Sequence, residues 1–214
     1  MLTTCEDSSL VVDRLSDQTR GENTAVTCFY FNFAARTEQS VTCMLGSLLK
    51  QIVSRMEKIP EKISRAFQKR KEALSGRKPQ LVDVVKMLQL ITSSYRTIMC
   101  IDALDECTAL QRFRLFDSLE QILAKSPRTR IFVTGRPHIR DEIERRLVGQ
   151  VVSVSVSPTR GDIIRYLRVR LGQDPTPGAM DQSLEAEILD KIPENVSEMC
   201  VAAMMLRTPS HTTC

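Results

Sequence analysis

Apolar positions along the chain follow two repeating patterns. Short runs rich in β-branched and aromatic residues predict strands, and these runs cover 25–31, 97–101, 130–134 and 151–156. Apolar residues that recur every three or four positions predict helices, at 9–20, 41–56, 60–74, 81–91, 110–123, 139–147 and 159–171. Because strands and helices alternate, we predict an α/β fold in which helices cover a parallel sheet.

The C-terminal part of the chain has a different character. A stretch rich in proline at 174–178 predicts a linker, 181–206 predicts two short helices, and 208–214 is polar. We therefore divide the chain into a core domain at 1–173 and a linker with an incomplete helical segment at 174–214.

The composition argues against several classes of protein. Thirty basic and 26 acidic residues give a net charge of only +4. The two signs are interleaved, as at 140–146, which is typical of a solvated helix face and not of a nucleic-acid site. No apolar run reaches the roughly 18 residues that a membrane span needs. We therefore expect no nucleic-acid partner and no membrane partner.

Seven cysteines and two histidines offer little material for a metal site or a disulfide framework. No two cysteines form a C-x-x-C pair. Cys28 and Cys100 lie inside predicted strands, which favours small buried hydrophobic side chains. Free thiols are typical of a reducing compartment, so we expect a cytoplasmic protein.

Three carboxylates directly after a predicted strand are the first candidate functional residues. Asp102, Asp105 and Glu106 follow the run at 97–101, and ligands of open parallel sheets bind at the carboxyl ends of the strands. Carboxylates placed there can hold Mg²⁺ through its water shell, and a neighbouring carboxylate can orient an attacking water. A surface turn that begins a helix also favours acidic residues, so the cluster alone leaves both interpretations open.

An arginine follows the next predicted strand. Arg136 comes after the run at 130–134, and Pro137 then ends the strand. Because a guanidinium binds phosphate oxygens through two parallel hydrogen bonds, Arg136 is placed to contact a phosphate. Taken alone, an exposed loop arginine is the simpler interpretation.

Together, the two clusters resemble a known family. The pattern is a strand with Asp102-x-x-Asp105-Glu106, then a helix, then a strand that ends in Thr134-x-Arg136-Pro137. It is similar to the NACHT family of signal-transduction NTPases, and most similar to the nephrocystin-3-like N-terminal domains of large fungal proteins. The resemblance covers residues 10 to about 206. It implies a partial P-loop NTPase fold, a three-layer sandwich with helices on both faces of the parallel sheet.

The resemblance also implies roles for single residues. Asp102 is the expected Walker B aspartate, which holds Mg²⁺ through water, and either Asp105 or Glu106 positions the hydrolytic water. Arg136 is the expected sensor of the γ-phosphate of ATP. The family usually has serine where this chain has Gly135, a departure that leaves Arg136 in place. ATP and Mg²⁺ are the implied cofactors, and the implied partners are other domains of a parent protein or copies of the same chain.

The family's phosphate-binding loop has no counterpart in the 214 residues. No G-x-x-x-x-G-K-[ST] run occurs, although its backbone N–H groups and its lysine supply the main phosphate contacts. The segment 10–15 resembles the helix that follows the loop. We therefore expect the Walker A strand to be missing and the chain to be N-terminally truncated. The strands at 130–134 and 151–156 then lack the strand between them, unless they close up or the gap is filled from outside.

Two functional interpretations follow. A chain without the loop is expected to bind or hydrolyse nucleotide poorly, as a degenerate signalling domain and not as an active enzyme. The alternative is an ATP/ADP-dependent oligomerisation switch in a larger protein whose loop lies upstream. A metal-dependent phosphoesterase is a weaker third interpretation, because it needs further metal ligands from other strands.

Overall fold

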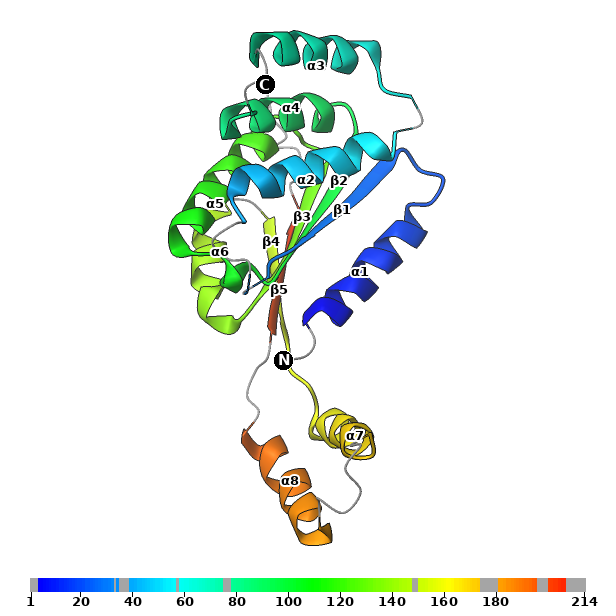
Figure 1. The fold of residues 1–214 in the computed structure, drawn as a ribbon, viewed down its shortest axis with the longest axis vertical. Helices are drawn as coiled ribbons and strands as arrows, with labels where there is room; N and C mark the ends of the chain where they lie inside the picture. The colour runs from blue at the N-terminus through cyan, green and yellow to red at the C-terminus, as the bar shows by residue number, and fades with distance from the viewer. Residues whose placement is uncertain are drawn as a thin grey trace, which may run out of the picture.

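A mixed sheet organises the chain. The structure is a computed structural model, and it describes residues 4–32, 34, 39–56, 58–74, 78–147, 150–173, 181–195 and 200–206. These residues form a five-stranded sheet in the order β1-β2-β3-β5-β4 (Figure 1). The strands are β1 (Thr24–Tyr30), β2 (Arg96–Asp102), β3 (Thr129–Gly135), β4 (Gln150–Val156) and β5 (Cys200–Leu206). β1, β2 and β3 are parallel neighbours, and β5 is antiparallel to both β3 and β4.

Helices connect the strands, as predicted. They are α1 (Thr4–Gln18), α2 (Val41–Ser54), α3 (Glu61–Leu74), α4 (Leu81–Thr92), α5 (Ala109–Ala124), α6 (Arg140–Arg146), α7 (Arg160–Leu171) and α8 (Gln182–Asn195). The side chains of Ser40, Thr108 and Thr159 accept hydrogen bonds from backbone N–H groups at the starts of α2, α5 and α7, which explains where these helices begin. The α/β class and the helices predicted between 9 and 171 are confirmed, with ends that shift by a few residues.

Helices cover both faces of the sheet, as predicted (Figure 1). The main hydrophobic core lies between the sheet and the helices α2, α4, α5 and α6, and its strand residues include Met99 and Ile131, which have no exposed surface. On the opposite face, Val12 of α1 packs over Val26 and Ile98. This second layer is narrower, because α1 lies over β1 and β2.

The last two helices stand apart from the core. α7 and α8 pack against each other beyond the end of the sheet (Figure 1), and α7 has no buried residue. A capping box starts α7, because Thr159 and Asp162 exchange side-chain and backbone hydrogen bonds. Within the described residues, no helix combines the length and apolar character that crossing a bilayer requires.

The C-terminal segment corrects two predictions. Residues 200–206 do not form a second short helix but the strand β5, which lies between β3 and β4. We expected no strand between those at 130–134 and 151–156, and β5 of the same chain occupies that position. A short apolar run does not distinguish a strand from a helix by its periodicity, and the backbone groups of β3 and β4 need a hydrogen-bonding neighbour. The predicted linker at 174–178 and the tail at 208–214 lie outside the described residues.

Ala203→Pro tests the place of β5. Ala203 lies opposite Val133 of β3 and Ser153 of β4, and proline removes a backbone N–H that a central strand needs. We expect urea denaturation to show a loss of about 2–3 kcal/mol in the free energy of unfolding. Ala203→Ser keeps the N–H and is expected to lose much less. Equal stability of the proline variant and the unchanged protein would contradict the central position of β5.

Candidate functional site

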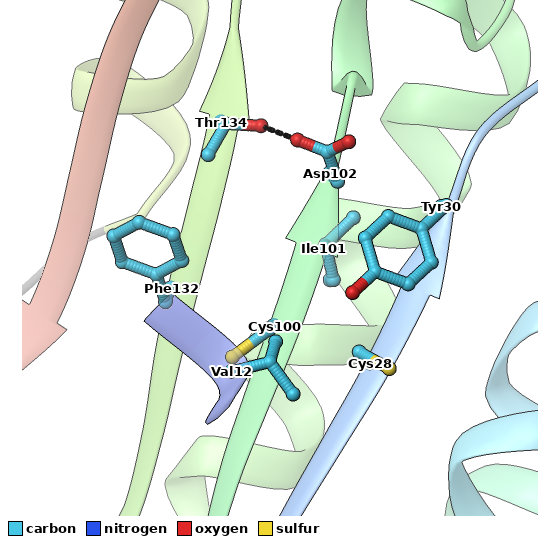
Figure 2. A pocket seen from close by; sticks show the side chains of 8 residues that line it. All are labelled: Val12, Cys28, Tyr30, Cys100, Ile101, Asp102, Phe132 and Thr134. Atoms are coloured by element: carbon cyan, nitrogen blue, oxygen red, sulfur yellow. Dashed lines mark hydrogen bonds between the residues drawn. The ribbon is translucent and has the colours of Figure 1, made fainter. Parts of the chain in front are cut away.

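The candidate site lies where β2 and β3 end side by side. The two strands pair in parallel register, with Ile101 opposite Val133, so the residues that follow them meet at one edge of the sheet. The hydroxyl of Thr134 donates a hydrogen bond to the carboxylate of Asp102 (Figure 2). The same hydroxyl accepts the backbone N–H of Ala103 at 3.1 Å. Asp102 is 2% exposed, so this contact fixes a buried carboxylate at the head of the acidic cluster.

A left-handed residue separates Asp102 from the other two carboxylates. Ala103 has a φ of 53°, a conformation that residues other than glycine rarely adopt. The chain then turns through a short 3-10 helix, Leu104–Glu106, and Leu104 is fully buried in the main core. The buried Leu104 side chain therefore fixes the turn that carries Asp105 and Glu106 to the main core.

Arg136 joins these two carboxylates. Its backbone N–H donates to Oδ1 of Asp105 at 3.1 Å, and its Nε lies 3.3 Å from Oδ2 of the same residue. Its Nη2 lies 3.5 Å from Oε1 of Glu106. The side chain of Arg136 is 65% exposed, whereas that of Asp105 is only 7% exposed. Arg136 is thus an exposed loop arginine, but one that two acidic residues hold in place.

Gly135 allows the loop after β3 to lie close to the acidic turn after β2. A Cβ atom at this position would clash with Cδ1 of Ile139 and would lie 3.4 Å from Oδ1 of Asp105. Ile139 is itself buried, so a side chain at 135 would have to displace part of the core. The family that the sequence resembles usually has serine at this position, and the close packing in this structure favours the glycine that the chain carries.

The sequence patterns missed two residues of the site. Thr134 was part of the pattern around Arg136 but had no role, although a hydroxyl at a strand end is a ready partner for a carboxylate. Arg112 lies on α5, where Nη1 donates to the carbonyl oxygen of Cys107 at 2.6 Å and Nε donates to Glu142 of α6 at 3.0 Å. Arg112 therefore fastens the end of the acidic turn, and nothing in its spacing points to that contact.

The floor beneath Asp102 is uncharged. A small pocket there is lined by Val12, Cys28, Tyr30, Cys100, Ile101, Asp102, Phe132 and Thr134 (Figure 2). Burial raises the pKa of the Cys100 thiol to about 12. Burial and a hydrogen bond with Cys28 also raise the pKa of the Tyr30 hydroxyl. Both groups are neutral at physiological pH, and Cys100 is confirmed as a small buried hydrophobic residue, whereas Cys28 is only half-buried.

The three carboxylates do not converge on one point. Among the described residues, no group of three or more histidine, cysteine or acidic side chains is arranged to hold a metal ion. Asp102 faces Thr134, whereas Asp105 and Glu106 face Arg136. A single carboxylate suits Mg²⁺ only when water and phosphate oxygens supply the remaining ligands.

Thr134→Val tests the bond at the head of the cluster. Valine keeps the shape of threonine but removes the hydroxyl that contacts Asp102 and Ala103. We expect denaturation at neutral pH to show a loss of about 1–3 kcal/mol in the free energy of unfolding. Thr134→Ser keeps the hydroxyl and should recover most of it. If valine is as stable as threonine, the bond does not hold the site together.

Comparison with known proteins adds one finding. A family model described as nephrocystin 3, N-terminal, matches residues 8–136. The match begins in α1 and ends at Arg136, so it includes Asp102, Asp105 and Glu106 as well. Neither the curated proteins nor the solved structures include one that matches this chain. Because the family model matches more than half of the chain, the protein belongs to the nephrocystin 3 N-terminal family.

Proposed function

We propose that the chain is a NACHT-type nucleotide-binding signalling domain of a larger protein, of the kind found in fungi. We also propose that its 214 residues by themselves bind or hydrolyse nucleotide poorly. The observation that carries the proposal is the set of contacts between the loops that follow β2 and β3. Arg136 pairs with Asp105 and Glu106, and these residues lie beside the hydrogen-bonded pair of Asp102 and Thr134. Acidic and basic groups brought together at the carboxyl edge of a sheet suit a bound metal–phosphate complex.

Asp102 is the proposed contact for Mg²⁺. Its carboxylate is held by Thr134 at the end of β2, and Mg²⁺ keeps much of its water shell when it binds proteins. Asp102 would therefore hold the ion through water, while nucleotide phosphates would complete the coordination. The ion would supply neutralisation of phosphate charge.

We propose Glu106, and not Asp105, as the residue that orients water. Asp105 is 7% exposed and accepts both the backbone N–H and the guanidinium of Arg136. Glu106 is 20% exposed and has a single, longer contact with Arg136 at 3.5 Å. A carboxylate with an accessible oxygen is better placed to position a nucleophile, so we assign Asp105 to holding the loop.

Arg136 is the proposed phosphate contact. A guanidinium can bind a phosphate through two hydrogen bonds, and its large exposure leaves room for a ligand. Exposed ion pairs contribute only about 0–1 kcal/mol each, so a phosphate could draw the side chain away from Glu106 at little cost. The backbone bond from Arg136 to Asp105 would keep the loop in place during that change.

We expect weak nucleotide binding because the 214 residues contain no phosphate-binding loop. The 214 residues contain no G-x-x-x-x-G-K-[ST] run, and without it the backbone N–H groups and the lysine that normally surround the β- and γ-phosphates are lacking. Arg136 and a water-bound ion would then carry the phosphate contacts alone. In a longer polypeptide that supplies the loop, the same residues would support an ATP/ADP-dependent switch, with other domains or other copies as partners in the cytoplasm.

Thermal unfolding with millimolar Mg²⁺-ATP tests the proposal. We expect a rise in Tm of about 1 °C, because a ligand near its Kd stabilises the folded state only slightly. Asp102→Asn should remove this rise, and no ATP turnover should be detected in either protein.

Glu144→Gln is the matched control. Glu144 is an exposed acidic residue of α6, so its substitution changes the charge equally without touching the site, and the response to Mg²⁺-ATP should persist. A response that survives in Asp102→Asn would place the nucleotide elsewhere. Rapid hydrolysis by the unchanged chain would contradict the proposed deficiency.

A further inference from the structure

The two edges of the sheet differ. At one edge, the side-chain amide of Gln51 on α2 satisfies both backbone groups of Cys28 on β1: the Cys28 N–H donates to Oε1 at 2.9 Å, and Nε2 donates to the Cys28 carbonyl at 2.8 Å. At the other edge, β4 pairs with β5 and with no other strand of the described residues. Among the described residues, no side chain forms a comparable bond with the outer backbone of β4.

Neither the sequence of β4 nor its pairing with β5 protects it as an edge strand. Its sequence, QVVSVSV, contains no charged residue, proline or glycine. Its pairing with β5 runs through seven consecutive residue pairs without a bulge, from Gln150 opposite Leu206 to Val156 opposite Cys200. Natural edge strands carry charges, prolines or bulges to prevent pairing with another chain, and β4 has none of these.

One side of β4 is apolar and exposed. Val152, Val154 and Val156 alternate along the strand and are 49%, 52% and 46% exposed. Val152 and Phe132 both lie opposite Met204 of β5, which places the valines on the face that α1 covers farther along the sheet. On the other face, the Ser153 hydroxyl accepts a hydrogen bond from Nε of Arg140 at 3.3 Å. The more apolar side of the strand is therefore the one left open.

We propose that β4 pairs with β4 of a second copy of this chain. The edge suits an extended strand, because the backbone of a second strand can pair with a whole row of N–H and C=O groups at once, whereas a side chain such as Gln51 pairs with those of a single residue. The segment Val152-Ser153-Val154-Ser155-Val156 reads the same in both directions, so it is self-complementary in an antiparallel pair. The seven uncharged residues bring no like charges together. This inference is independent of nucleotide binding.

The register follows from the valines. A two-fold axis perpendicular to the sheet, passing beside Val154, places Val154 opposite its own copy and Val152 opposite Val156. Each of these three valines then faces a valine on the same side of a continuous sheet, and the two open faces join. If one strand slipped by one residue relative to the other, each valine of one copy would lie opposite a serine of the second copy, and the valines of the two copies would point to opposite faces of the sheet. Pro158 limits further extension of the paired strand.

A cysteine at the axis tests the register directly. In an antiparallel pair, directly opposite Cα atoms are about 4.5–5.5 Å apart, which suits a disulfide. We expect Val154→Cys to form a covalent dimer under mild oxidation, visible on a non-reducing gel, in at least about tenfold greater yield than the unchanged chain, whose native cysteines set the background. Ser155→Cys is the matched control, because residue 155 lies opposite 153 and is about 7–8 Å or more from its own copy.

Sedimentation measures the association without oxidation. The unchanged chain should show a concentration-dependent shift from monomer to dimer. Val154→Lys puts two like charges face to face and should weaken the dimer by at least about tenfold, whereas Ser155→Lys should weaken it less. Circular dichroism checks that both variants are folded. Two results would overturn the proposal: a monomer at all concentrations, or equal cross-linking of Val154→Cys and Ser155→Cys.

Discussion

The parallel register of β2 and β3 is the constraint on which the candidate site depends. Asp105 and Arg136 are 31 positions apart in the sequence, and they meet because their strands end level at one edge of the sheet. Between them the chain crosses the helical face as α5, whose residues Leu115 and Leu119 are fully buried. The packing of this crossover sets the distance between the two loops, so the site is a product of the core beneath it.

The site is rigid near the sheet and accessible farther out. Asp102 and Thr134 are buried and bonded to each other, whereas the guanidinium of Arg136 is largely exposed. Arg112 ties the end of the acidic turn to α6. An arrangement of this kind fixes the position of the carboxylates and keeps the paired cationic group at the surface.

Much of the fold could be predicted from the sequence, because long amphipathic stretches have a clear period. The helices at 41–56 and 81–91 bury a stripe of leucine, isoleucine, valine and methionine side chains, and the pattern predicts that stripe. The strand at 200–206 could not be predicted, because its place depends on pairing with β3 and β4, both distant along the chain. Tertiary pairing thus decided what local propensity left open.

The candidate site shows the same division. The residue types of Asp102, Asp105, Glu106 and Arg136 pointed to one edge of the sheet, and the structure brings the last three into contact. Three other features depend on distances across strands and helices. They are the hydrogen bond between Thr134 and Asp102, the left-handed conformation of Ala103 and the hydrogen bond from Arg112 to the Cys107 carbonyl. A one-dimensional pattern contains no such distances, so these contacts stayed beyond prediction.

The most direct measurement is a nuclear magnetic resonance titration of the folded chain with Mg²⁺-ATP, following backbone amide shifts residue by residue. We expect the largest shifts at Ala103, Glu106 and Arg136, with the Arg136 side-chain Nε signal moving as a phosphate replaces Glu106. Shifts centred on other elements, or Arg136 signals that stay unchanged while other residues respond, would contradict a nucleotide site built from the acidic cluster and Arg136.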